Sequence, residues 1–583
     1  MSTTASDSSA PSASEPTAGY EKPQQDLVPR RAAYWPVLAP AGLIVTVFVA
    51  VAAFAPTWFA AQLEVVNKLV VSSIGWYYVL LVAAFVVFSL WCGISRYGDV
   101  TLGQDDEEPE YGLFSWFAML FAAGMGIGLV FWGVAEPLNH LATPPPGGPT
   151  LEQNPGVAAQ NAMTTTFLHW GLHAWAIYVV VGLAIAYAVH RRGRPVSIRW
   201  ALEPVFGDRV KGVLGDVVDI VAIVGTVFGV ATSLGFGVVQ LSAGLEVLGI
   251  AGQSISLLLW LTLGITLLAL MSVVSGLDVG IKWLSNINLV LAGVLVLAML
   301  LLGPTLFILR EFVQNIGLYV ARLVELSFRT MPFQGQDGEA WLGAWTTYYW
   351  GWWISWSPFV GIFIARISRG RTVREFVLGV LLAPTLLTFT WFSILGGSAI
   401  YRELFGGGGL IGADGSVATE ASLFSLLADM PGAAVLSGLF LILIVVFFVT
   451  SSDSGSFVVS MLSAGGDPQP HVAIRVFWGL VAGAIAAVLL WVGHQQGEGG
   501  LEAGLSALQT MAILVAAPFT LVMIAMCVST FRALHAEHRR TVRLERATLR
   551  RELALELAES GDLAPAADRP EQPRGRSRFG RRR

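Results

Sequence analysis

The stretch WTTYYWGWWISWSPFVGIF, residues 345–363, holds five tryptophans and two tyrosines in one apolar run. A buried tryptophan needs a partner for its indole N–H, and in membrane helices tryptophan is enriched near the two membrane surfaces. Tryptophans concentrated along the middle of an apolar segment therefore indicate a special role for their rings.

The composition is that of a membrane protein. The chain has 583 residues, of which 55% are hydrophobic and 13% charged, whereas soluble proteins carry about 25% charged residues. A segment of about 20 apolar residues can cross a bilayer. We predict twelve such spans, at about 36–59, 70–94, 114–136, 164–189, 213–247, 254–275, 283–308, 341–365, 374–400, 432–462, 472–493 and 503–531.

Basic residues are gathered in the loops 190–200 and 365–375 and in the C-terminal tail. Because Lys and Arg are favoured on the cytoplasmic side, we expect both termini in the cytoplasm and the protein in the cell inner (plasma) membrane. Apolar residues at helical spacing in 309–323 predict an amphipathic helix on the outer face. Residues 1–33 have the composition of a disordered cytoplasmic tail.

Spans three to seven and eight to twelve form two halves of five, and each half opens on an unusual segment. The first opens with FAAGMGIGLVFWGVAEP, residues 121–137, and the second with the tryptophan run. Each glycine lowers helix propensity by about 1 kcal/mol, so Gly124, Gly126 and Gly128 predict an unwound stretch. Interrupted segments at matching positions of two halves are typical of a transporter's binding site. The alternative is that the glycines only allow close helix packing.

Aromatic residues on two spans could enclose a cation. On a continuous helix, Trp170, Trp175 and Tyr178 share one side, and tryptophans of span eight form a second arc. A quaternary ammonium has no N–H to donate, and aromatic faces attract it by ~2 kcal/mol or more when desolvated. No Asp or Glu lies in 167–189 or 341–365 to serve as a counter-ion. The alternative is aromatic packing between helices.

Two blocks carry a resemblance to a known family. GMGIGLVFWGVAEP (124–137) and YYWGWWISWSPFVGIFIARISRGRTVREF (348–376) resemble the two signature blocks of the betaine/carnitine/choline transporters, and the segments 167–173 and 450–456 match in order. The resemblance implies an all-α membrane protein of twelve transmembrane helices, with two inverted five-helix repeats (LeuT-like) preceded by two extra helices, commonly as a homotrimer. The transporter domain would be 34–531, with repeat one at about 114–308 and repeat two at about 341–531.

The resemblance also implies a binding site for a small zwitterionic or cationic substrate. It places Trp170, Trp175, Tyr178 and Trp353 around a trimethylammonium group, with Trp352 and Trp356 along the same route. The peptide N–H groups near the start of a helix attract anions. The family pattern directs those of Gly126, Ile127 and Gly128 at the substrate carboxylate.

A sodium site is implied in the same way. The hydroxyls of Thr450 and Ser451 would join carbonyls that match Ala122, Met125 and Phe447, although such hydroxyls also bond to preceding carbonyls of their own helix. A second sodium site would use Thr226 and Phe359, but Val230 stands where that site has its other hydroxyl.

Two differences from other members of the family bear on which ion is coupled to transport. Gly128 replaces the Asp of proton-coupled carriers. Span five holds no basic residue between Val213 and Leu248, unlike the sodium-independent exchangers.

The implied function is sodium-coupled import of a compatible solute, glycine betaine first, with sodium as coupling ion and no catalytic residues, other cofactor or nucleic acid. Ectoine, proline, carnitine, choline or dimethylsulfoniopropionate, or sodium-independent exchange, are alternatives within the family. A membrane enzyme and an osmosensor without transport are rivals of other classes. His169 and His173 lack a nearby third ligand along the sequence, which disfavours a metalloenzyme.

A few acidic residues lie within or near the predicted spans, and an Arg-rich tail follows the last span. Acids in spans are functional suspects by default, but we expect network and capping roles for Asp216, Asp219, Glu136 and Asp453. The tail 532–583 has fourteen Arg and eight Asp or Glu, and its charge spacing at 535–559 predicts a helix continuing span twelve. Such a tail attracts anionic lipid by about 1 kcal/mol per charge, and it either responds to osmotic stress or anchors the topology.

Overall fold

Helices make up nearly all of the regular structure in the computed structural model, which describes residues 33–124, 126–275, 282–496 and 500–559. Within those ranges the extended pairing consists of two isolated bridges, Thr101 with Thr372 and Ile411 with Val417. The chain divides into two units, one up to Phe531 and one from Arg532. The predicted N-terminal tail lies outside the described residues except for Ala33.

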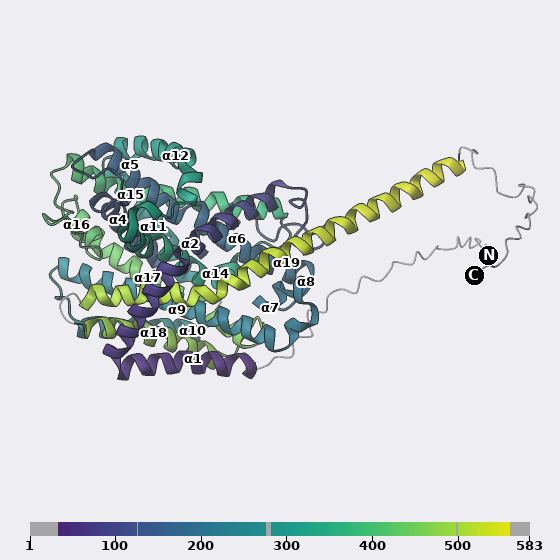
Figure 1. Ribbon diagram of the computed structural model, residues 1–583, viewed down its shortest axis with the longest axis horizontal. Coiled ribbons are helices and arrows are strands. Elements are labelled where there is room, and N and C mark those ends of the chain that lie inside the picture. The colour runs from purple at the N-terminus through teal and green to yellow at the C-terminus, as the bar shows by residue number, and fades with distance from the viewer. Residues whose placement is uncertain (1–32, 125, 276–281, 497–499, 560–583) are drawn as a thin grey trace, which may run out of the picture. The chain divides into compact units, whose positions relative to one another are not determined.

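The order of helices follows the predicted order of spans (Figure 1). Before the amphipathic segment come α1 (Trp35–Phe54), α2 (Pro56–Ile94), α3 (Leu113–Gly124), α4 (Ile127–Ala142), α5 (Pro155–Trp170), α6 (Leu172–Ala186), η1 (Tyr187–Arg191), α7 (Ile198–Ala201), α8 (Glu203–Phe206), η2 (Gly207–Lys211), α9 (Val213–Val247), α10 (Ile255–Ser275) and α11 (Lys282–Leu302).

The second part of the chain starts with the amphipathic helix and contains the tryptophan run. It comprises α12 (Thr305–Ser327), η4 (Pro332–Gln334), α13 (Gly335–Leu342), η5 (Gly343–Thr347), α14 (Tyr348–Arg366), α15 (Val373–Phe405), α16 (Ser422–Ala428), α17 (Ala433–Ser463), α18 (Val472–His494) and α19 (Gly500–Glu559).

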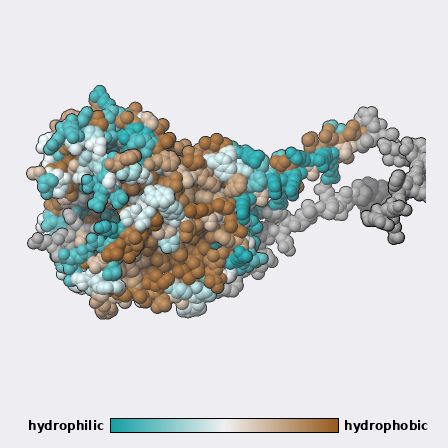
Figure 2. All heavy atoms as spheres, in the orientation of Figure 1, coloured by the Kyte–Doolittle hydropathy of each residue, from teal (hydrophilic) through white to brown (hydrophobic). Residues whose placement is uncertain are grey.

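By length and apolar composition, nine helices among the described residues could cross a membrane, or ten if the bent pair α11–α12 counts as one. The third and the eighth predicted spans are not among them, and a break divides the third into helices of 12 and 16 residues. Hydrophobic side chains gather in Figure 2 over the region of α1 and α18, whose exposed residues include Leu43, Val47 and Leu480. This surface fits a hydrocarbon solvent.

The break predicted at the alternating glycines is present. α3 ends at Gly124 and α4 begins at Ile127, with Gly126 in an extended conformation (φ −142°, ψ −158°) before it. The long α9 runs unbroken over 35 residues. The tryptophan run is not interrupted as the glycine segment is, because π-helical η5 leads directly into the continuous α14.

A second break, which the sequence analysis missed, divides span four at Gly171. The assumption of one continuous helix over 169–178 was therefore wrong. Gly171 has φ −96° and ψ −139°, and a Cβ there would lie 2.4 Å from the Phe167 carbonyl oxygen and 2.9 Å from Phe389 of α15. The ring of Phe389 also stacks on Phe167, with centroids 3.9 Å apart. The close approach of α15 explains why a glycine stands here.

Side chains from other helices bond to the backbone groups that this break releases. Trp353 Nε1 donates to the His169 carbonyl at 2.8 Å, and Thr388 Oγ1 donates to the Trp170 carbonyl at 3.1 Å. The Leu172 N–H donates to the Tyr319 hydroxyl at 3.3 Å. Free backbone groups are costly inside a membrane protein, so α12, α14 and α15 stabilise the break.

The predicted amphipathic helix is α12, bent by 108° from α11. Span seven accordingly ends at Leu302, earlier than predicted. The exposed apolar residues of α12 include Leu309, Val313 and Val320, while polar Glu311 and Asn315 are buried. The side that faces the protein is mixed, since Ile308, Tyr319 and Leu326 are buried as well, and α12 lies next to α5 and α15 in Figure 1.

Close packing of α6 against α14 rests on a pair of glycines. A Cβ at Gly182 would lie 2.6 Å from Ile364, and a Cβ at Gly361 would lie 2.5 Å from Val181. Small residues at such positions let two helix backbones approach. The two aromatic spans are thereby held side by side.

We expect Gly171→Ala to destabilise the protein by about 1–3 kcal/mol, the usual cost of overpacking, because the methyl group collides with Phe389 and the Phe167 carbonyl. Thermal unfolding of the purified protein measures this. Gly264→Ala in α10 is the matched control, since a Cβ there would meet no described atom within 4 Å. Equal melting temperatures for both variants would contradict the proposed role of the break.

Candidate functional site

The aromatic residues predicted to form a box come together from α5, α6 and α14. The ring of Trp353 lies 4.8 Å from that of Trp170, 4.6 Å from that of Trp352 and 6.4 Å from that of Tyr178. Trp175 lies 5.4 Å from Tyr178. Most of these pairs meet edge to face, whereas Trp352 and Trp353 are stacked. We call Trp170, Trp175, Tyr178, Trp352 and Trp353 the aromatic box.

All five rings of the box are buried. Their polar atoms differ in how they are paired. Trp353 Nε1 bonds to the His169 carbonyl, whereas Tyr178 Oη, Trp352 Nε1 and the nearby Trp356 Nε1 have no hydrogen-bond partner among the described residues. A buried donor without a partner costs about 1–3 kcal/mol, so these atoms mark a place that suits a polar ligand.

The start of α4 lies against the box. A Cβ at Gly128 would stand 2.6 Å from Trp352 Cη2 and 3.1 Å from Trp170 Cη2. A Cβ at Gly126 would stand 3.2 Å from Trp356 Cη2. The first N–H groups of any helix have no partner within it. α4 begins at Ile127 and therefore brings such donors close to the rings.

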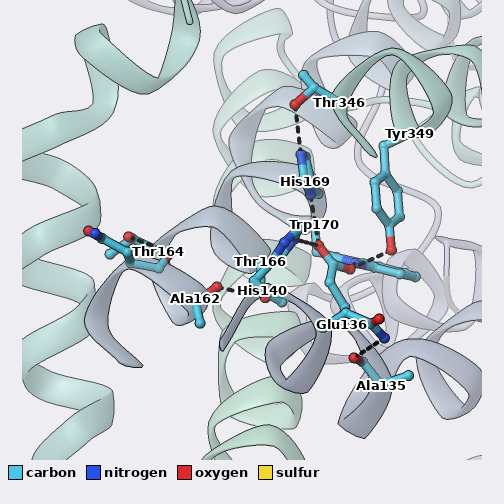
Figure 3. A network of polar contacts seen from close by, with 12 residues as sticks. Ala135, Glu136, His140, Ala162, Thr164, Thr166, His169, Trp170, Thr346 and Tyr349 are labelled. Carbon is cyan, nitrogen blue, oxygen red and sulfur yellow. Dashed lines mark hydrogen bonds and ion pairs between the residues drawn. The ribbon is translucent and has the colours of Figure 1, made fainter. Parts of the chain in front are cut away.

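Behind the box lies a network centred on Glu136 of α4 (Figure 3). Trp170 Nε1 donates to Glu136 Oε2 at 2.6 Å, and the Tyr349 hydroxyl donates to the same oxygen. His169 Nδ1 lies 2.7 Å and His140 Nε2 3.3 Å from Glu136 Oε1. His169 Nε2 lies 3.1 Å from the Thr346 hydroxyl. Sequence reasoning expected a network role for Glu136 but could not name its partners, because they come from three separate spans.

Glu136, His140 and His169 also form the one group among the described residues whose atoms could hold a metal ion. The expectation that His169 and His173 lack a nearby third ligand is corrected for His169, which has Glu136 and His140 beside it, whereas His173 is not part of the group. However, the distance of 2.7 Å from His169 Nδ1 to Glu136 Oε1 is that of a direct hydrogen bond. His173, the other histidine, lies 2.8 Å from the Ser327 hydroxyl and belongs to a different contact.

The predicted sodium ligands are brought together only in part. Ser451 Oγ of α17 would lie 3.3 Å from a Cβ on Gly126, so α17 adjoins the break. Thr450 Oγ1 donates to the Val446 carbonyl at 2.9 Å, which is the local bonding expected of a helical threonine. Ala122 lies in the last turn of α3 and Phe447 in α17. Met125 lies outside the described residues.

The residues of the doubtful second ion site belong to facing helices, α9 and α14. Thr226 Oγ1 is buried and has no hydrogen-bond partner among the described residues. The buried Phe359 lies next to Trp356, with ring centroids 5.5 Å apart. Val230 points at α17, where its Cγ2 would stand 2.8 Å from a Cβ on Gly455.

The remaining acids take part in networks, as expected. Arg199 Nε lies 2.6 Å from Asp219 and its Nη2 2.8 Å from Asp216. Asp453 accepts a bond from Ser272 at 2.8 Å and pairs with Arg475 at 3.3 Å. These contacts tie helices together, since each partner comes from another element.

Fold and site together define a multi-pass helical membrane protein with a buried aromatic cluster. Comparison with known families matches residues 36–539 to the one described as BCCT, betaine/carnitine/choline family transporter. The chain therefore belongs to the betaine/carnitine/choline transporter family, whose members are transporters and not enzymes.

Named relatives agree with this assignment. The chain is 51% identical over 516 residues to an uncharacterized transporter of Mycobacterium tuberculosis, covering 88% of this chain and 84% of that protein. It is 47% identical over 477 residues to glycine betaine transporter OpuD of Bacillus subtilis, covering 82% and 90%. It is 42% identical over 500 residues to a glycine betaine transporter of Acinetobacter baylyi, covering 85% and 72%.

We expect Gly128→Ala to raise the apparent KM for the transported solute by at least about tenfold, or about 1.4 kcal/mol, because the methyl group displaces Trp352 and Trp170. Uptake kinetics in proteoliposomes measure this. Gly438→Ala in α17 is the control, since a Cβ there meets no described atom within 4 Å. An unchanged KM in Gly128→Ala would contradict the assignment of the start of α4 to the binding site.

Proposed function

We propose that the protein imports glycine betaine, or a closely related solute with a quaternary ammonium group, by sodium symport across the plasma membrane. The observation that carries the proposal is the aromatic box beside the start of α4. Its rings suit a methylated cation, which hydroxyls and carbonyls satisfy poorly. The N–H groups of Gly126, Ile127 and Gly128 suit the carboxylate at the other end of the same molecule.

Two relatives that are named as glycine betaine transporters, at 47% and 42% identity, support this choice of substrate. The unpaired donors of Tyr178, Trp352 and Trp356 support it as well, because a zwitterion brings acceptors to them. The same uptake assay tests the alternative substrates that share parts of this chemistry, namely ectoine, proline, carnitine, choline and dimethylsulfoniopropionate.

We propose sodium as coupling ion because hydroxyls of α17 adjoin the break between α3 and α4. Ser451 lies beside Gly126. Thr450 and Phe447 lie about one helical turn or less from Ser451 on the same helix, α17. Sodium is a hard cation that prefers oxygen ligands, and backbone carbonyls freed by broken helices coordinate it in other transporters. The second ion site is weaker, since Val230 offers no oxygen.

The proposed architecture follows the family pattern. The helices α1 and α2 would precede two related halves, one from α3 to α11 and one from α13 to α19, giving twelve spans with both termini in the cytoplasm. α19 continues as a helix to Glu559. Its arginines would contact anionic lipid at the cytoplasmic surface, from where the tail could respond to osmotic stress.

Uptake of labelled glycine betaine into proteoliposomes of the purified protein tests the function. An inward sodium gradient should drive accumulation, and its dissipation should release the solute. Accumulation of another solute with no effect of betaine would contradict the proposed substrate. Betaine uptake that ignores sodium would contradict the proposed coupling.

Replacement of Trp353 separates a cation–π contact from packing. We expect Trp353→Leu to raise the apparent KM for betaine roughly 30-fold, which corresponds to a cation–π loss of ~2 kcal/mol. Trp353→Phe should cost several-fold less, because it retains an aromatic face although it loses the bond to the His169 carbonyl. Initial uptake rates over a range of betaine concentrations measure both. Equal effects of the two variants would rule out the cation–π contact.

One proposed sodium site and one that lacks a hydroxyl at Val230 lead to a quantitative expectation. One inward sodium ion at 100 mV contributes about 2.3 kcal/mol, and a tenfold gradient adds about 1.4 kcal/mol, together enough for roughly 500-fold accumulation of a zwitterion. We expect a sodium Hill coefficient near one, and loss of the sodium dependence in Thr450→Ala with Ser451→Ala. The sodium gradient at which net flux reverses measures the stoichiometry. A reversal point corresponding to two ions would contradict the expectation.

A further inference from the structure

A buried carboxylate reaches the aromatic box from outside the two aromatic spans. Those spans contain no Asp or Glu at 167–189 or 341–365. Glu136 of α4, however, accepts the indole N–H of Trp170 at 2.6 Å and the hydroxyl of Tyr349. Its side chain is completely buried. One wall of the box is thus hydrogen-bonded to a carboxylate, as Figure 3 shows.

The bonds from Trp170 and Tyr349 suit an ionised carboxylate. An indole N–H is a donor only, and an ionised carboxylate accepts at about four lone-pair positions. Glu136 has four partners, two at each oxygen, namely Trp170 and Tyr349 at Oε2 and His169 and His140 at Oε1. Donors bonded to the charged form stabilise it. Its partners are neutral or weakly basic groups, so the charge of an ionised Glu136 would act on the surrounding rings.

We propose that Glu136 is the buried counter-anion of the aromatic box and that it selects substrates with a positively charged end group. Its charge acts across a medium of low dielectric constant, where screening is weak. Its hydrogen bond also draws the indole proton toward the oxygen and leaves the face of Trp170 more negative, which strengthens the attraction for a cation. The inference rests on the proposed function, since it presupposes a quaternary ammonium among these rings.

The rival account is that Glu136 only holds Trp170 and Tyr349 in place. Both accounts predict weaker binding when the residue is changed, so affinity alone does not separate them. A pair of ligands with the same shape and different charge does. In 3,3-dimethylbutyrate a tert-butyl group replaces the trimethylammonium group of glycine betaine, while the carboxylate remains.

The measured quantity is the preference ratio, the inhibition constant of 3,3-dimethylbutyrate divided by that of unlabelled glycine betaine, in competition with labelled betaine for the purified full-length protein. We expect Glu136→Gln, which keeps the size of the side chain and removes its charge, to lower the ratio roughly tenfold, or about 1.4 kcal/mol. Glu136→Asp keeps the charge and should weaken both ligands while retaining most of the ratio. Glu311→Gln is the control, a buried glutamate of α12 that bonds to Asn315, and should leave the ratio unchanged.

A wild-type ratio in Glu136→Gln would overturn the inference, and so would an equal fall in the Gln and Asp variants, because geometry would then be responsible. If Glu136→Gln yields no folded protein, Trp170→Phe serves instead, since it keeps a ring and removes the N–H bond to Glu136. An unchanged ratio in that variant also overturns the inference. Failure of the wild type to bind betaine would contradict the proposed function. The counter-anion role fails separately where the wild type binds betaine but the ratio stays unchanged in Glu136→Gln or falls equally in the Gln and Asp variants.

Discussion

Inside a membrane, every backbone N–H and C=O group that a broken helix releases must find a partner in the protein, because hydrocarbon offers none. The break at Gly171 shows how this constraint organises the structure. The His169 carbonyl accepts a hydrogen bond from the indole N–H of Trp353, and the Trp170 carbonyl accepts one from the hydroxyl of Thr388. The Leu172 N–H donates to the hydroxyl of Tyr319. The bond to Trp353 fixes that ring between the two aromatic spans. The position of the box therefore depends on the break.

The box is held from its other side by hydrogen bonds to a buried carboxyl group. Glu136 sits eight residues after Gly128 on α4, so one helix brings both the glycine that lets Trp352 approach and the carboxylate that holds Trp170. Buried networks of this kind are strong only when every member is satisfied. Here each carboxyl oxygen has two partners, while the buried His140 Nδ1 has none among the described residues. Breaks and network together turn a row of tryptophans, which would otherwise be packing, into a site that suits a desolvated cation.

Much of this could be predicted from the sequence, where the signal is local. The alternating glycines before Ile127 predicted the first break, and hydropathy placed most helices within a few residues. The break at Gly171 was missed because a single glycine in an apolar run is as typical of helix packing as of a break, and its cause, Phe389, lies far along the chain. Glu136 was assigned a network role, but its partners could not be named, since their contact depends on how three spans pack. The high number of tryptophans pointed to the box from the sequence. How their rings face one another could be seen only in the structure.

A structure of the protein with glycine betaine and sodium bound tests the central claim most directly. The account predicts the trimethylammonium group between the faces of Trp170, Trp175, Tyr178 and Trp353, with the carboxylate toward the N–H groups at the start of α4. The N–H bond from Trp170 to Glu136 should persist in that complex. Density for the ligand away from these rings, or a box closed by direct ring contacts while betaine binds elsewhere, would contradict the account.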